Sequence, residues 1–277
     1  MIESPIAFVG GGNMARSLIG GLLADGCRAD HIRVADPNLA QIQALQRQYG
    51  IETSLENEQI LAGAQAVLLA VKPQVMKPVL QEIGGAVRAE RPLIISIAAG
   101  IRERDISAWL SASDLPIVRA MPNTPALVQS GATGLYANPA VDDSQRALAE
   151  SILRAVGLTV WVDREELIDT VTGLSGSGPA YFFLLMEAME DAAHELGLPR
   201  ETARLLSLQT AFGAAKLALE SDEGVAELRK RVTSPGGTTE QAIDTFERGG
   251  LRTLVGDAVR AAKIRSAELA DTFGGAA

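Results

Sequence analysis

FVGGGNMA, residues 8–15, joins a short apolar run to a segment with helical periodicity near the start of this 277-residue chain. Its small residues follow the pattern G-x-G-x-x-A at Gly10, Gly12 and Ala15. Gly10 permits a tight turn, Gly12 lets a phosphate approach the backbone, and Ala15 allows the helix to pack closely on the strand. A strand, such a turn and a helix in this order are typical of proteins that bind the pyrophosphate of a dinucleotide.

Apolar runs of strand length alternate with helix-length segments as far as residue 163. The runs are mostly continuous rather than alternating, which is typical of strands buried on both faces of a parallel sheet. They lie at residues 6–10, 32–35, 66–71, 93–97, 117–121 and 158–162, with helical segments such as 13–25, 39–49 and 75–87 between them. The pattern predicts an α/β fold, with a Rossmann-like doubly wound parallel sheet in an N-terminal dinucleotide-binding domain, residues 1–163.

After residue 163 the sequence contains no convincing strand pattern. A long apolar helix is predicted over residues 181–196, a second helix extends to about residue 221, a shorter one follows, and two more complete the chain. These helices are apolar around much of their circumference, and such helices usually need a partner surface. Residues 164–277 are therefore expected to form an all-α domain that binds substrate and mediates dimerisation.

The composition disfavours several classes of partner and site. A formal net charge of −9 and a pI of about 4.9 argue against nucleic acid or an anionic membrane surface as the main partner. Cys27 is the single cysteine, which suggests a reducing compartment. The N-terminus has no basic region of a signal peptide, and the long uncharged runs are broken by proline and glycine, so we expect a cytoplasmic protein. His31 and His194 lie in no ligand-spaced motif, and no metal site is predicted.

Asp36 follows the second predicted strand, where an acidic residue would accept hydrogen bonds from the ribose of the adenosine. A carboxylate there would repel the 2′-phosphate of NADP and so favours NAD, although the neighbouring Arg33 would offset that repulsion. NADH and NADPH both remain open as cofactors.

Three more loops leave the carboxyl ends of predicted strands, where open α/β sheets bind ligands. They contain VKPQ at 71–74, AAG at 98–100 and MPNTP at 121–125. Lys72 is placed either against a cofactor phosphate or in solvent. Asn123 lies in a loop stiffened by two prolines, which suits either holding a side chain against a cofactor or a plain rigid crossover.

SPGGTT, residues 234–239, interrupts the helical half of the chain. Proline removes an amide, two glycines free the backbone, and three hydroxyl groups crowd into six residues. Such a turn at the start of a helix leaves backbone N–H groups unbonded, so it is either a simple helix cap or an anion-binding site.

Seven segments in this order resemble the pyrroline-5-carboxylate reductases over nearly the whole chain. They are FVGGGNMA (8–15), AVKP (70–73), RAMPNTP (119–125), LSGSGPAY (174–181), GLPR (197–200), QT (209–210) and VTSPGGTT (232–239). The resemblance implies NADPH- or NADH-dependent reduction of 1-pyrroline-5-carboxylate to L-proline, the last step of proline biosynthesis. It also implies a homodimer, in many members assembled further into a decamer.

The resemblance further implies roles for individual residues. Cofactor contacts fall on Gly10, Gly11, Gly12, Asn13 and Met14 at the pyrophosphate, Asp36 and Asn57 near the ribose, Ala70, Val71, Lys72 and Pro73 beside the nucleotide, and Ala98, Ala99, Gly100 and Asn123 towards the nicotinamide. Substrate contacts fall on Val232, Ser234, Gly237 and Thr238 at the carboxylate and on the catalytic Thr239, whose hydroxyl lies against the ring nitrogen.

Three other functions remain as alternatives. A 3-hydroxyacid dehydrogenase of similar architecture needs a basic lysine, but the predicted helix at 181–196 has none and Lys216 lies on the next one. A metal-dependent enzyme would have to use the carboxylates of Glu187, Glu190, Asp191 and Glu195, a spacing more typical of a solvated helix face. A non-catalytic nucleotide-sensing module would explain the glycine-rich turn but not residues 234–239.

Overall fold

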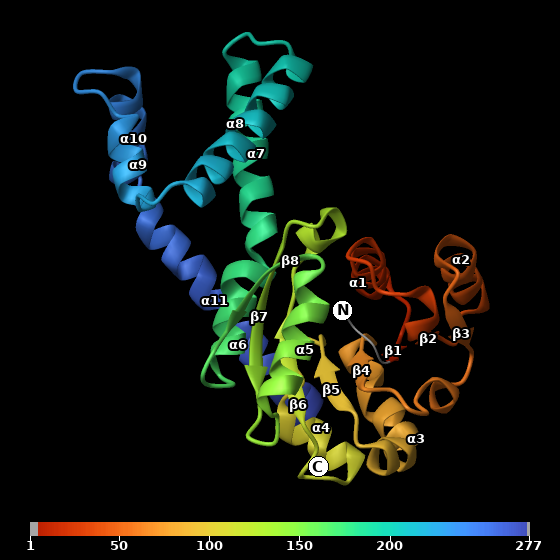
Figure 1. The fold of residues 1–277 in the computed structure, drawn as a ribbon. Coiled ribbons are helices and arrows are strands. Elements are labelled where there is room, and N and C mark those ends of the chain that lie inside the picture. The colour runs from red at the N-terminus through yellow and green to blue at the C-terminus, as the bar shows by residue number, and fades with distance from the viewer. Residues whose placement is uncertain (1–4, 276–277) are drawn as a thin grey trace. The chain divides into compact units, whose positions relative to one another are not determined.

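The computed structural model describes residues 5–275, and the chain divides into two compact units (Figure 1). One unit contains the chain up to Ser177 and again from Arg260, and the other is Gly178–Val259. The predicted boundary at residue 163 lies just after the last strand, so the two divisions differ. The difference arises because a short helical segment and the end of the last helix pack with the strands.

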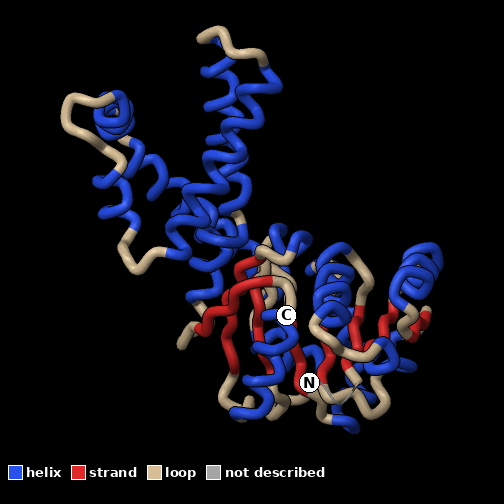
Figure 2. Tube along the Cα trace, turned by 45° about the horizontal axis from the view of Figure 1, so that its top comes forward, coloured by secondary structure: helices blue, strands red, loops and turns tan. Residues whose placement is uncertain are grey.

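The strands of the first unit lie together with helices around them (Figure 2). They form an eight-stranded sheet in the order β3-β2-β1-β4-β5-β6-β7-β8. The strands are β1 (Ile6–Val9), β2 (Ile32–Ala35), β3 (Glu52–Ser54), β4 (Ala66–Leu69), β5 (Leu93–Ser96), β6 (Ile117–Met121), β7 (Gly131–Ala137) and β8 (Gly157–Trp161). Successive strands move outward from β1 in one direction and from β4 in the other. The loops after β1 and β4 therefore lie at the point where the strand order reverses, which is where such sheets bind ligands.

The sheet is parallel apart from one pair. Strands β6 and β7 are antiparallel, with Val118 opposite Ala137 and Met121 opposite Gly134. The sequence analysis did not predict β7 or the short β3. The GATGLYA sequence of β7 is rich in glycine and alanine, which have little strand propensity, and it becomes a strand because tertiary contacts cover it.

Helices cover both faces of the sheet. In the first unit they are α1 (Asn13–Ala24), α2 (Leu39–Tyr49), α3 (Pro73–Glu90), α4 (Glu103–Leu110), α5 (Asp143–Arg154) and α6 (Leu167–Val171), which continues into a π-helical turn, Thr172–Gly176. Alternate strand residues enter two separate apolar cores: Phe8 packs with Leu18 of α1 and Leu45 of α2, whereas Val9 packs on the side of α3 and α4. The predicted doubly wound α/β fold is thus confirmed.

The last helix, α11 (Leu251–Gly274), ends against the loop that follows β5. Arg102 forms an ion pair with Asp271 at 2.6 Å, and a Cβ on Gly100 would lie 3.3 Å from the Cβ of Leu269. The Ser266 hydroxyl donates to the Asp169 carboxylate at 2.6 Å. These polar contacts fix the end of α11 within the first unit.

The second unit consists of helices. These are α7 (Gly178–Glu195), α8 (Arg200–Glu220), α9 (Val225–Arg231), α10 (Thr238–Arg248) and the start of α11. Large apolar side chains remain exposed on α7 and α8, among them Phe182, Phe183, Leu184 and Phe212. Such a surface suits association with another apolar surface. Over residues 5–275, no helix has the length and apolar character needed to cross a membrane.

Candidate functional site

The glycine-rich turn after β1 is held tightly on one side. Gly10 has φ +99°, and a Cβ there would lie 2.8 Å from the carbonyl oxygen of Ala70. Its N–H donates to the carbonyl of Ala35 at 2.8 Å. Only glycine fits this position, because a side chain would meet both an unfavourable backbone angle and the loop that follows β4.

The same turn is open on its other side, at the start of α1. Gly12 caps the helix without a side chain, and no atom lies within 4 Å of the place where its Cβ would be. The first helical hydrogen bond runs from Arg16 to Gly12, so the N–H groups of Asn13 and Met14 precede it. Unbonded amides, a helix dipole and free space together fit the pyrophosphate of a dinucleotide.

Asp36, directly after β2, is hydrogen-bonded to the glycine-rich turn. Its carboxylate accepts from the N–H of Gly11 at 2.9 Å, from the N–H of Asn38 at 2.8 Å and from Nε2 of Gln41 at 3.0 Å. Asp36 therefore fixes the loop as well as presenting a negative charge beside it. The sequence analysis missed Gln41, which has no motif of its own.

Most of the other predicted cofactor residues follow β3, β4 and β5 of the first unit. Ala70 and Val71 follow β4, Lys72 caps α3 with an exposed side chain, and Pro73 is the first residue of that helix. Asn57, after β3, donates from Nδ2 to Glu82 of α3 at 3.2 Å. Ala98, Ala99 and Gly100 follow β5, and Gly100 has φ +70°.

Asn123, in the loop after β6, is buried, and both polar atoms of its side chain have protein partners. Its Oδ1 accepts from the N–H of Ala132 at 2.8 Å, and its Nδ2 donates to the carbonyl of Ser175 at 3.0 Å. Ser175 belongs to the π-helical turn, a feature frequently found at functional sites. The structure therefore links the MPNTP loop to the LSGSG segment through one side chain.

The SPGGTT segment of the second unit forms a β-turn that leads into α10, as predicted. Gly237 donates its N–H to the carbonyl of Ser234 at 3.0 Å, and Gly236 has φ +72°. Proline at the second position and glycine with positive φ at the third define a type II turn. Gly237 caps α10 without a side chain.

The first helical bond of α10 runs from Gln241 to Gly237. The N–H groups of Thr238 and Thr239 precede it, so they are the amides of this turn best placed to bind an anion. The N–H of Gly236 instead donates to Glu240 Oε2 at 2.7 Å. The sequence analysis missed Glu240, although its position three residues after the cap is typical of a capping box.

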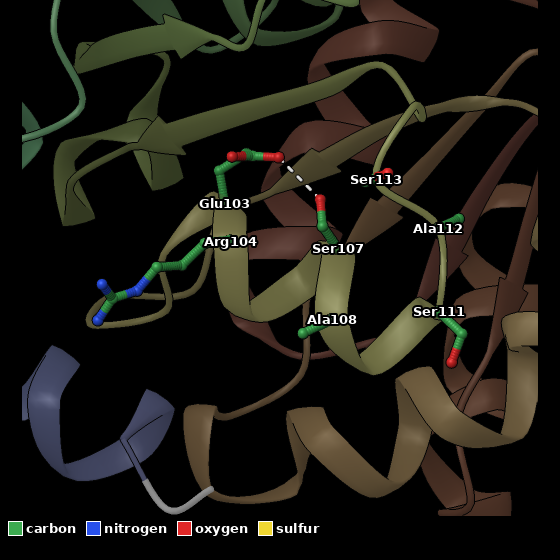
Figure 3. Close-up of a pocket in the computed structure, with 7 residues that line it drawn as sticks. All are labelled: Glu103, Arg104, Ser107, Ala108, Ser111, Ala112 and Ser113. Atoms are coloured by element: carbon green, nitrogen blue, oxygen red, sulfur yellow. Dashed lines mark hydrogen bonds between the residues drawn. The ribbon is translucent and has the colours of Figure 1, made fainter.

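A polar cluster that the sequence did not predict lies beside α4. The Glu103 carboxylate accepts from the Ser107 hydroxyl at 2.7 Å (Figure 3) and from Nδ2 of Asn138 at 3.2 Å. The buried Arg119 forms an ion pair with Glu165 at 2.9 Å, and the same oxygen of Glu165 accepts the N–H of Glu103 at 2.7 Å. These contacts join α4 to β6 and to the segment before α6.

An open pocket of about 550 Å³ runs along α4 (Figure 3). It is lined by Glu103, Arg104, Ser107, Ala108, Ser111, Ala112 and Ser113. None of these residues is among the predicted cofactor contacts.

Two of the acidic residues of α7, Glu190 and Asp191, are engaged with a neighbouring cation. Arg200 forms ion pairs with Glu190 at 3.3 Å and with Asp191 at 3.0 Å. Within residues 5–275, no group of three or more His, Cys, Asp or Glu side chains is arranged to hold a metal ion.

The doubly wound sheet and the open glycine-rich turn at its switch point define a dinucleotide-binding oxidoreductase fold. Residues 5–100 match the family model of NADP oxidoreductases described as coenzyme F420-dependent, and residues 165–269 match the pyrroline-5-carboxylate reductase dimerisation model. The chain belongs to the pyrroline-5-carboxylate reductase family. This confirms the predicted family, the enzyme class and the reaction, and the alternative functions are not supported.

Individual relatives agree along almost the whole chain. The pyrroline-5-carboxylate reductase of Pseudomonas aeruginosa is 53% identical, over 97% of this chain and 98% of that protein. The solved structure of the Coxiella burnetii enzyme has a TM-score of 0.93 at 49% identity, covering 96% of this chain and 98% of that one. The Plasmodium falciparum enzyme, solved with NADP bound, has a TM-score of 0.84 at 28% identity, covering 98% and 99%.

Proposed function

We propose that this chain reduces 1-pyrroline-5-carboxylate to L-proline in the cytoplasm, with NADPH or NADH as the cofactor. The observation that carries the assignment to particular residues is the type II turn at Ser234–Gly237, which opens α10 and leaves amides free for a carboxylate. Family membership supports the reaction, and the open helix start at Gly12 supports the cofactor.

The cofactor is assigned to the loops of the first unit. Gly10, Gly11, Gly12, Asn13 and Met14 surround the start of α1 and would hold the pyrophosphate. The remaining contacts are assigned to Asp36, Asn57, Ala70, Val71, Lys72, Pro73, Ala98, Ala99, Gly100 and Asn123. When bound, the reduced nicotinamide supplies a hydride.

The substrate carboxylate is assigned to the turn of the second unit. The N–H groups of Thr238 and Thr239 and the hydroxyl of Ser234 would bind it, with Val232 and Gly237 shaping the turn. The N–H of Gly237 already donates to the carbonyl of Ser234, so Gly237 contributes through the conformation of the turn and not through a hydrogen bond to the substrate. Helix amides bind an anion without an arginine or lysine, so no basic side chain is needed here.

Thr239 is assigned to the ring nitrogen. The reaction adds a hydride to the carbon of the protonated C=N bond, and the electron pair of that bond passes to nitrogen, which becomes an amine. A threonine hydroxyl both donates and accepts hydrogen bonds, so Thr239 Oγ1 can accept from the iminium N–H and remain bonded to the product. Most of the rate enhancement then comes from positioning.

Self-association is assigned to the second unit, whose α7 and α8 expose large apolar side chains within the region that matches the dimerisation model. We assign a homodimer to this surface. Further assembly into a decamer stays a prediction.

A steady-state assay of imine reduction with Thr239→Val tests the assignment. We expect kcat to fall about 100-fold, while the affinity for the dinucleotide, measured by fluorescence titration, stays within about twofold because the cofactor loops lie in the other unit. Thr245→Val is the matched control, since its hydroxyl bonds to the Gln241 carbonyl two helical turns after the cap region. Unchanged kcat in Thr239→Val would remove Thr239 from the mechanism.

A further inference from the structure

The turn before α10 contains one peptide group whose orientation decides the turn type. In a four-residue turn, types I and II differ by a flip of the peptide between the second and third residues. Here that peptide joins Pro235 to Gly236, and the φ of +72° at Gly236 places it in the type II orientation. Glycine tolerates both orientations, so its own backbone does not lock the turn.

Glu240 contacts that peptide. Its Oε2 accepts the N–H of Gly236 at 2.7 Å, from the third residue of α10. The cap residue Gly237 has no side chain. Within the described residues 234–240, the bond from the Gly236 N–H to the Glu240 carboxylate is therefore the only side-chain hydrogen bond that caps the start of α10. A flip of the Pro235–Gly236 peptide would replace this N–H by the Pro235 carbonyl, which a carboxylate repels.

We propose that Glu240 is a positioning residue for substrate binding, which holds the Pro235–Gly236 peptide in the type II orientation. This inference rests on the proposed function, since it takes the turn as the carboxylate site. The bond occupies the Gly236 amide, and the turn itself occupies that of Gly237, so the substrate carboxylate is directed to Thr238 and Thr239. Glu240 acts on the substrate through the turn and does not touch it.

The charge of Glu240 opposes its geometric role. A carboxylate near the N-terminus of α10 repels the substrate carboxylate. If this repulsion dominated, removal of Glu240 would tighten substrate binding. If orientation dominates, as we infer, removal weakens it, and the sign of the change in KM separates the two.

Three variants at two positions of α10 test the proposal. In Glu240→Ala the bond to Gly236 is lost, and we expect KM for 1-pyrroline-5-carboxylate to rise about fivefold. We expect kcat and KM for the dinucleotide to change less than about twofold, since Glu240 is assigned no contact with the reacting atoms and the cofactor loops belong to the other unit. Glu240→Gln keeps an oxygen that accepts the same N–H, so its KM is expected to stay within about twofold of the wild type. Asp244→Ala, one turn further along the exposed side of α10, is the matched charge control and is expected to behave as the wild type.

Three results would overturn the proposal: a lower KM in Glu240→Ala, equal impairment in Glu240→Gln and Glu240→Ala, or no difference between Glu240→Ala and Asp244→Ala. Ser234→Ala separates this inference from the proposed function. If Ser234→Ala leaves the imine KM unchanged, the turn is not the substrate site and both proposals fail. If it raises that KM while Glu240→Ala does not, only the role of Glu240 fails.

Discussion

The carboxylate of Asp36 accepts a hydrogen bond from the backbone N–H of Gly11 at 2.9 Å. The same side chain accepts from the N–H of Asn38 and from Gln41. Asp36 therefore combines two effects at the proposed cofactor site: it holds the glycine-rich turn in place, and it brings a negative charge to the end of β2. The two effects predict different consequences of mutation.

Replacing Asp36 by serine is expected to shift the cofactor preference towards NADPH. Loss of the charge removes a repulsion of about 1 kcal/mol from the 2′-phosphate, so the ratio of kcat/KM for NADPH over NADH rises about fivefold. Both cofactors also bind more weakly, because Gly11 loses its acceptor. Gln41→Ala is the matched control, since it loosens the carboxylate but keeps the charge. A ratio that does not move in Asp36→Ser would show that Asp36 does not face the ribose.

The buried ion pair between Arg119 and Glu165 is expected to stabilise the first unit. The side chain of Arg119 is only 5% exposed, so Glu165→Ala leaves a buried cation without its partner and costs about 3 kcal/mol in the free energy of unfolding. Arg119→Met lowers the free energy of unfolding by less, because the Glu165 carboxylate still accepts from the N–H of Glu103 and keeps some contact with water. Chemical denaturation measures both changes, with Glu247→Gln in an exposed ion pair as a nearly silent control. Equal effects of Glu165→Ala and Glu247→Gln would contradict this prediction.

Local sequence patterns predicted the parts of the molecule that depend on short-range physics. The glycine-rich turn at Gly10, the strands β1, β2, β4, β5, β6 and β8, and the helices after Gly178 follow from apolar periodicity and turn chemistry. The turn before α10 is also predictable from the sequence, because a proline and two glycines within six residues are typical of a turn. The roles assigned to residues in these loops came from a family resemblance, and they stay proposals.

Local sequence patterns do not predict which distant segments of the chain contact each other. The end of α11 has the periodicity of any helix, and nothing in it shows that Asp271 reaches Arg102 or that Ser266 reaches Asp169. The bonds of Asn123 to Ala132 and Ser175 join three segments in the same way. The division of the chain into units depends on such long-range packing, which explains why the sequence placed the boundary after β8.

Tyr136 on β7 is expected to titrate above the usual range of tyrosine. Burial raises the pKa of its phenol, and the nearby charges of Glu165 and Glu103 raise it further. Because the folded-state pKa lies above the unfolded value of about 10, the stabilisation is complete below pH 10 and is lost as the pH rises through the folded pKa. Phenolate absorbance, taken as the difference between wild type and Tyr136→Phe, gives the midpoint. Glu165→Gln should lower that midpoint, and a midpoint at or below 10 in the wild type would contradict this prediction.

Asn123 is expected to stabilise the contact between the loop after β6 and the π-helical turn. In Asn123→Ala the N–H of Ala132 and the carbonyl of Ser175 both lose their partner, which costs about 1–3 kcal/mol in the free energy of unfolding. Asn123→Asp keeps the acceptor for Ala132 but sets a carboxylate oxygen against the Ser175 carbonyl, so its loss of stability should shrink at acidic pH, where the protonated carboxyl can donate. Urea denaturation at two pH values measures this difference. Asn38→Ala, which removes a helix cap, is the control and costs about 1 kcal/mol at either pH. A loss in Asn123→Asp that does not depend on pH would show that the Nδ2 bond to Ser175 contributes little.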